Sequence, residues 1–183
     1  ISRSVRLRSS ASAYFSRTFG TPTDATKWTF SGWCKRGTTG LQSIFGANDF
    51  NGGANTSTHI FWVGSSSSEV LTFQWYNGGF VSSVASSAVY RDFSSWYHIV
   101  VKYDSTQATA SNRVLLYVNG VQLTSVTNYA GSAATYPSQN ASSFIDTATG
   151  HRIGGYSNGY LDGYLTEINF IDGQALTPTS FGA

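Results

Sequence analysis

The sequence predicts an all-β domain, and three of its features support this prediction. Aromatic residues make up 15% of the 183 residues, and their wide flat rings pack well on pleated, half-buried strands. Charged residues make up only 11%, so the polar surface must come mainly from Ser, Thr, Asn, Gln and Tyr. Short segments of alternating polarity follow one another between turn residues, with hardly a helical pattern among them.

A chain of this length most simply forms one domain, residues 1–183, which would bury roughly 70% of the surface that the unfolded chain exposes. It has no apolar run of about 18 residues and no basic-then-apolar start, so we expect a soluble chain without a signal peptide or a membrane-inserted segment. The lack of Met and the first residue, Ile1, suggest a fragment or a processed product. The single Cys34 cannot form an intramolecular disulfide, and we expect a buried thiol.

The formal net charge of +2 gives nucleic-acid binding no general electrostatic support. Positive charge gathers in residues 1–20, where we expect basic N-terminal strands at Val5–Ser9 and Ala13–Arg17 around a Ser-Ser-Ala turn. Arg side chains that alternate along an edge strand discourage pairing with another sheet edge. The same side chains are our candidates for binding the acidic surface of a partner: Arg3, Arg6 and Arg8.

The most regular strand is predicted at Lys27–Arg36, where Trp28, Phe30, Gly32 and Cys34 share one face. The same alternation and intervening turn signals, including Asn-Gly for a tight hairpin, predict the other strands. These are Gln42–Ala47, His59–Gly64, Val70–Tyr76, Phe80–Ala85, Trp96–Tyr103, Arg113–Val118, Val121–Val126 and His151–Gly155.

Residues 127–150 are rich in Ser, Thr, Asn and Ala and predict a long polar loop. Compact domains seldom carry a loop of about twenty residues without a purpose, so we expect it to be functional or packed on a partner.

The C-terminal segment Tyr160–Gly182 predicts a strand that pairs with His151–Gly155 and is covered on both faces. Thr177-Pro178 then has the pattern of a short helix start, with Pro at the first helical position. The apolar residues of this strand fall on two faces. One face carries Leu161, Gly163 and Leu165. Tyr164, Ile168 and Phe170 need a second apolar surface.

Five sequence blocks occur in a characteristic order: Lys27–Lys35, Trp96–Asp104, Leu116–Gly120, Ile153–Gly155 and Leu161–Ile168. Together they resemble the laminin-G-like, concanavalin A-like lectin/glucanase superfamily over nearly the whole chain. Ser-Ala-Tyr near the start and Leu-Asp-Gly-Tyr-Leu near the end are similar to domains of bacteriophage tail and other virion proteins. The resemblance implies a jelly-roll β-sandwich of two antiparallel sheets, with at most a short C-terminal helical turn.

The resemblance implies glycoside hydrolysis as one activity, because some members of the superfamily carry paired carboxylates. Retaining hydrolysis needs two carboxyl groups roughly 5 Å apart. Glu69 and Glu167 are the only glutamates, and they lie in separate segments. We therefore expect no catalytic residue and keep hydrolysis as a remote alternative.

We also expect no metal site or cofactor. His59, His98 and His151 do not stand at metal-ligand spacing from another His, Cys or acid. Asp104 and Asp162 fall where the superfamily sometimes places calcium ligands, but no dense Asp/Asn loop surrounds them, so we expect turn residues there.

Carbohydrate binding is the second activity that the resemblance implies. Sugars are held by aromatic rings against their C–H faces and by amides and hydroxyls at their edges, and this composition supplies both. The candidates are aromatic residues beside turns: Trp62, Trp75, Tyr129, Tyr136, Tyr156 and Tyr160.

The third activity is structural, because a sandwich with few charges can bury flat surface against neighbouring chains at low desolvation cost. We expect a non-enzymatic protein at the surface of a virion, acting as an adhesion module for host glycans. The alternative is a capsid or tail decoration protein that packs on other virion proteins. In both cases we expect a homo-oligomer or a component of a larger assembly.

Overall fold

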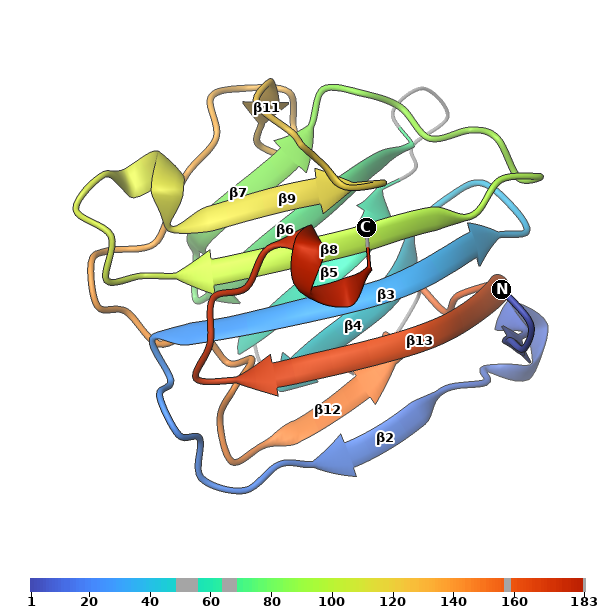
Figure 1. Ribbon diagram of the computed structural model, residues 1–183, viewed down its shortest axis with the longest axis horizontal. Helices are drawn as coiled ribbons and strands as arrows, with labels where there is room; N and C mark the ends of the chain where they lie inside the picture. The colour runs from blue at the N-terminus through green and yellow to red at the C-terminus, as the bar shows by residue number, and fades with distance from the viewer. Residues whose placement is uncertain (49–55, 64–68, 157–158, 183) are drawn as a thin grey trace.

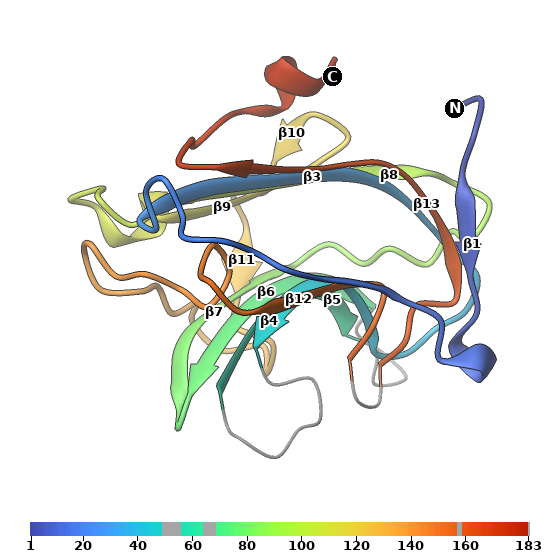
Figure 2. The same ribbon diagram turned by 90° about the horizontal axis from the view of Figure 1, so that it is seen from below.

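The computed structural model describes residues 1–48, 56–63, 69–156 and 159–182, and two antiparallel sheets pack face to face in it (Figures 1 and 2). This arrangement confirms the predicted all-β sandwich. The six-stranded sheet has the order β1 (Val5–Leu7), β13 (Gly163–Asp172), β3 (Lys27–Arg36), β8 (Tyr97–Asp104), β9 (Val114–Val118) and β10 (Val121–Gln122). The seven-stranded sheet has the order β11 (Val126–Thr127), β7 (Phe80–Ser86), β6 (Val70–Asn77), β5 (Thr56–Val63), β4 (Gln42–Asn48), β12 (Gly150–Ile153) and β2 (Phe15–Thr18).

The helices of the described residues are short 3-10 turns at Ser9–Ala11, Ala110–Asn112 and Pro178–Phe181. None of them has the length and the apolar character that crossing a lipid bilayer would need. The C-terminal turn begins where the sequence predicts it, with Pro178 at the first helical position and buried. The side chain of Thr177 makes no capping hydrogen bond, so proline geometry rather than a cap starts this turn.

The core lies between the sheets and is built from aromatic rings of both. Within the six-stranded sheet, Trp28 stacks on Tyr103 with ring centroids 5.1 Å apart. Across the interface, Phe30 of β3 stacks on Phe45 of β4 at 5.2 Å. The inward face predicted for Lys27–Arg36 is confirmed, because Trp28, Phe30 and Cys34 are all buried in this core.

Strand β13 places two of the three residues that the sequence assigned to a second apolar surface, Ile168 and Phe170, on its inner face instead. The pairing with β3 shifts between Thr166 and Asn169, and Glu167 has a positive φ of 52°. This β-bulge places one extra residue on β13, so Leu165 before it and Ile168 and Phe170 after it all pack against the core. Opposite the bulge, a side chain on Gly32 would overlap the end of Ile168. The bulge and this glycine bring Ile168 and Phe170 to the face of Leu165, whereas Tyr164 points to the other face and lies beside Trp96.

Two predicted strands have partners that the sequence did not indicate. Val121–Val126 is not one strand, because its first part pairs with β9 and its last part pairs with β7 in the other sheet. His151–Gly155 does not pair with the C-terminal strand; β12 lies between β4 and β2. Alternation within a segment indicates a strand but not its partner, since the partner is distant in sequence.

The segment predicted as a long polar loop, residues 127–150, packs on its own domain. Trp28 Nε1 donates to Ser143 Oγ at 3.3 Å, and the Tyr103 hydroxyl donates to the carbonyl of Ala141 at 2.7 Å. Ser143 and Ile145 are fully buried. This segment therefore closes one end of the core.

The C-terminal tail, residues 174–182, lies on the outer face of the six-stranded sheet (Figures 1 and 2). Thr29 of β3 holds it in place, because its hydroxyl donates to the carbonyl of Gln174 at 2.7 Å and accepts from the amide of Leu176 at 2.8 Å. On the same face, Val100 and Tyr117 are buried. The tail therefore helps to cover this face.

Candidate functional site

A row of aligned residues crosses the outer face of the seven-stranded sheet. Their chain neighbours Phe45, Ile60 and Phe73 are buried in the core, so the alternation of a strand points the row away from the core. In register, the row contains Ser16 of β2, Arg152 of β12, Gly46 of β4, His59 of β5, Gln74 of β6 and Ser83 of β7.

His59 lies over Gly46, its partner on the neighbouring strand. A side chain on Gly46 would overlap Nδ1 and Cε1 of the imidazole. Glycine inside a strand often marks a place where another group approaches the backbone closely. Gly46 therefore sets the position of the His59 ring.

The His59 ring forms one wall of a shallow hollow of about 100 Å³. The ring of Tyr156 lies 4.3 Å from it at an angle of 59°, and Phe61 stands edge-on at 6.5 Å. The other lining residues are Leu41, Ser43, Ser57 and Gln74. An aromatic face beside hydroxyl and amide groups suits a sugar, which offers apolar C–H faces and polar edges.

The four tyrosines predicted as ligand contacts lie in four different settings. Tyr156 is at the hollow, and Tyr160 lies beside Tyr14 with ring centroids 6.1 Å apart. Tyr129 is exposed next to Phe80 of β7, with centroids 5.2 Å apart. Tyr136 is half-buried and packs against the core, and this burial raises the pKa of its hydroxyl. Tyr156 is the one that lines the hollow with His59.

The prediction that Trp62 and Trp75 contact a ligand is wrong, because both side chains belong to the core. Trp62 lies under the guanidinium of Arg36, whose central carbon is 5.1 Å from the ring centroid. Strand alternation gives the reason: Ile60 and Trp62 point inward, so His59 and Phe61 point outward.

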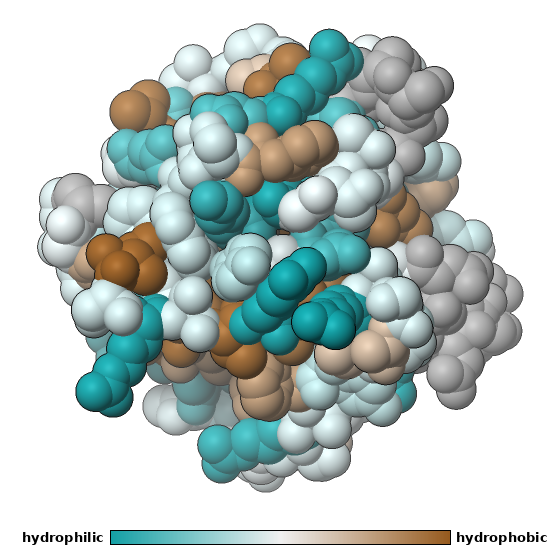
Figure 3. All heavy atoms as spheres, turned by 90° about the vertical axis from the view of Figure 1, so that its right-hand side faces the viewer, coloured by the Kyte–Doolittle hydropathy of each residue, from teal (hydrophilic) through white to brown (hydrophobic). Residues whose placement is uncertain are grey.

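The predicted partner-binding residues Arg3, Arg6 and Arg8 are exposed around the edge strand β1. The guanidinium of Arg6 lies over Tyr164 of β13, 5.6 Å from the ring centroid. The end of the sandwich that Figure 3 faces has small apolar patches separated by polar residues. Partner binding through these arginines stays a prediction.

The two glutamates have separate structural settings. Glu69 is buried and forms an ion pair with Arg36, and Arg36 also donates to the carbonyl of Tyr90 at 2.9 Å. Glu167 is exposed at the bulge of β13, in the other sheet. A buried, hydrogen-bonded ion pair holds a carboxylate in place, so Glu69 has a structural role.

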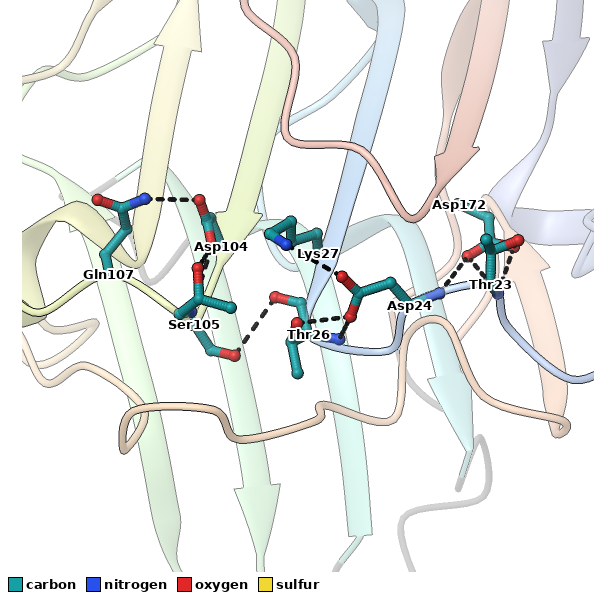
Figure 4. A network of polar contacts seen from close by, with 9 residues as sticks. Thr23, Asp24, Thr26, Lys27, Asp104, Ser105, Gln107 and Asp172 are labelled. Atoms are coloured by element: carbon teal, nitrogen blue, oxygen red, sulfur yellow. Dashed lines mark hydrogen bonds and ion pairs between the residues drawn. The ribbon is translucent and has the colours of Figure 1, made fainter.

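Three aspartates stabilise chain reversals at one rim of the sandwich (Figure 4). Asp24 accepts hydrogen bonds from Thr26, Asp104 accepts from Thr106 and Gln107, and Asp172 accepts from Thr23. Asp162, at the other end of β13, accepts from Ser9 at 3.2 Å. In the part of the chain that the structure describes, no three His, Cys, Asp or Glu side chains form a group that could hold a metal ion.

Asp146 of the segment 127–150 is buried close to Asp172, where the segment passes the end of β13. Burial and the charge of Asp172 raise the pKa of Asp146 to about 7. Burial also acts to raise the pKa of Asp172, but hydrogen bonds from Thr23 outweigh it and hold that pKa below its usual value. One carboxyl of the pair therefore keeps its proton to near neutral pH.

Sequence reasoning missed His59 as a site residue, as well as Gly46, Phe61 and Gln74 of the same face. The alternation in Thr56–Val63 carried a signal for His59 and Phe61, since Ile60 and Trp62 would pair inward. No signal within the sequence places Gly46 beneath His59, because that contact depends on which strands are neighbours.

Residues 9–180 match the model of a protein family described as the concanavalin A-like lectin/glucanases superfamily. The chain belongs to this family. Its members share a sandwich architecture, and a shared architecture alone does not determine what a domain binds. No curated protein sequence matches this concanavalin A-like domain.

Solved structures with a similar fold include three from quite different proteins. Domain 4 of AbnA, an extracellular arabinanase from Geobacillus stearothermophilus in complex with arabinotriose, is 16% identical with a TM-score of 0.58, and the match covers 84% of this chain and 64% of that one. The CBM40 of a Ruminococcus gnavus IT-sialidase, bound to α2,3-sialyllactose, is 14% identical with a TM-score of 0.58, covering 97% and 93%. Domains LG4-5 of the mouse laminin α1 chain are 14% identical with a TM-score of 0.56, covering 90% and 42%. At these identities the likeness establishes the fold.

Proposed function

We propose that this domain binds carbohydrate without catalysing a reaction, and that the ligand lies on the outer face of the seven-stranded sheet. The observation that carries the proposal is the hollow in which Tyr156 packs on the largely buried His59, beside Ser43, Ser57 and Gln74. The sugar complexes of the similar arabinanase and sialidase domains support it by analogy of fold.

The geometry favours reversible binding over chemistry. Glu69 is held by Arg36, and Glu167 lies in the other sheet at the bulge. Neither glutamate lines the hollow. The hollow supplies the contacts of a lectin, namely ring faces, hydroxyls and amides.

Replacing Tyr156 by Ala tests the site directly. We expect affinity for the best ligand of a mixed glycan array to fall about tenfold or more, because one stacking ring is lost. Tyr164→Ala is the matched control, since Tyr164 is also half-exposed but lies in the six-stranded sheet beside Trp96. A flat array with folded protein, or equal loss in both variants, would contradict the proposal.

The setting at a virion surface is a further part of the proposal, and its support is the sequence resemblance. A second candidate function, packing on neighbouring protein chains, is favoured by the edge strand β2, whose four residues are all exposed. The N-terminal arginines Arg3, Arg6 and Arg8 lie on the adjoining segment. If this candidate is right, replacing all three by Gln should release the protein from its native particle while its glycan binding stays unchanged.

A further inference from the structure

The hollow beside Tyr156 is too small to enclose a whole oligosaccharide. Its volume is about 100 Å³. Enclosed ligand pockets are usually about 300 Å³ or more. A sugar at this hollow therefore inserts only an edge or a substituent, and the remainder of a longer ligand must lie on the surrounding sheet face.

A second group of aromatic rings lies on the same face, at the far side of β6. Phe80 of β7 is 53% exposed, and its ring centroid is 5.1 Å from that of Tyr76 and 5.2 Å from that of Tyr129. Tyr129 is 42% exposed. Large apolar rings at this level of exposure, gathered in one place, commonly mark a contact surface.

The register of the strands connects this group to the hollow. Ser57, which lines the hollow, is the partner of Tyr76, and Tyr76 is the partner of Phe80. In the adjacent row, His59 is followed by Gln74 and then Ser83, whose hydroxyl accepts a hydrogen bond from the backbone amide of Tyr129 at 3.1 Å. Two strand spacings separate β5 from β7, roughly 10 Å. This distance is longer than one sugar ring.

Among the residues that the structure describes, the strip between the two aromatic groups carries no charged side chain. Its side chains are the hydroxyl of Ser57, the amide of Gln74 and the ring of Tyr76, followed by Phe80 and Tyr129. Resting on the proposed function, we propose that the face binds a chain of neutral sugars across β5, β6 and β7. One sugar contacts Tyr156 and His59, and a later one stacks on Phe80 and Tyr129.

The opposite direction across the sheet would select a different ligand. There the row continues from Gly46 to Arg152, whose guanidinium lies 4.3 Å from the ring centroid of Tyr14. A guanidinium on this side would favour a sugar with a carboxylate, because Arg binds carboxylates through two parallel hydrogen bonds. The two directions therefore predict opposite charge preferences.

Affinity as a function of chain length tests the proposal. The probes are arabino-oligosaccharides and cello-oligosaccharides from the monosaccharide to the hexasaccharide, with sialyllactose as the acidic probe, measured by titration calorimetry. We expect affinity for a neutral series to rise with length until the chain reaches the second group. Phe80→Ala should remove that rise, about tenfold, and leave binding of the shortest ligand unchanged.

The control variant is Phe15→Ala, because Phe15 of β2 is 51% exposed and lies at the far edge of the same sheet. It should bind every probe as the unmodified domain does. Binding only to sialyllactose, lost in Arg152→Gln and kept in Phe80→Ala, would overturn this proposal and leave the proposed function standing. Neutral binding that is independent of length would also overturn it, and failure to bind any of these probes or any glycan of the array would remove both.

Discussion

The two sheets turn very different outer faces to their surroundings. On the six-stranded sheet, Val100 and Tyr117 are buried although they point away from the core, and the tail at residues 174–182 lies over this face. On the seven-stranded sheet, Tyr156 and Phe80 stay accessible beside polar side chains. Both faces carry aromatic residues, so aromatic content alone does not mark a site. Among the described residues, the tail covers the aromatic side chains of the first face, whereas those of the second stay accessible.

Removing residues 174–182 should produce the largest effect, because it would strip this cover from the six-stranded sheet. We expect the free energy of unfolding to fall by about 3–5 kcal/mol, from the lost hydrogen bonds of Thr29 and the newly exposed apolar surface. Urea denaturation measures this loss. Gln174→Ala is the control and should change stability little, since Thr29 binds the backbone carbonyl of residue 174. A loss below about 1 kcal/mol on removing the tail would contradict its covering role.

Two glycines sharpen the comparison, because one lies against the core and the other lies under the site. Gly32→Ala should lower stability by about 1–3 kcal/mol, since the new methyl group overlaps Ile168 in the packed interior. Gly46→Ala should instead displace the His59 ring and weaken glycan binding about tenfold.

Thermal unfolding and glycan titration of both variants provide the measurement. We expect Gly46→Ala to cost less stability than Gly32→Ala, and Gly32→Ala to bind glycan normally where it remains folded. The opposite pattern would show that the outer face of the seven-stranded sheet is structural and not a binding surface.

The smallest expected change in the free energy of unfolding concerns Asp146, in the segment 127–150, and it depends on pH. Asp146 keeps its proton to about pH 7 when folded, whereas an unfolded Asp loses it near pH 4. A raised carboxyl pKa means stability that is present below the unfolded pKa and lost as the pH rises through the folded one.

Asp146→Asn should therefore gain stability over the unmodified domain as the pH rises from about 4 to 7. We expect a difference of at least about 1 kcal/mol at pH 7.5. Asp172 does not contribute to this difference, because both proteins share it and its lowered pKa leaves it ionised throughout this pH range. Melting temperatures at pH 4, 5.5 and 7.5 measure it. A difference that shrank with rising pH would contradict the assignment of the shared proton to Asp146.

Much of the sandwich was predictable, because period-two alternation in segments such as Lys27–Arg36 depends only on local sequence. Strand partners were not, and this explains the wrong pairing of His151–Gly155. The sequence predicted only part of the candidate site for the same reason. Tyr156 was identified as an aromatic residue among turn residues, whereas Gly46 and His59 become a site only when β4 and β5 lie side by side. Trp62 stands near a turn in the sequence, but it shares the inward parity of Ile60 and is therefore buried.

The bulge in β13 changes how its sequence should be interpreted. Without Glu167, the segment would read Leu165, Thr166, Ile168, Asn169, Phe170, a simple alternation of apolar and polar residues. The extra residue therefore adds nothing to burial, because the same side chains would face inward without it. Its contribution is local bending and twist of the strand, as bulges generally provide. Glu167 is thus an extra residue opposite Gly32, outside the regular strand pairing. We expect it to bend the six-stranded sheet at this point.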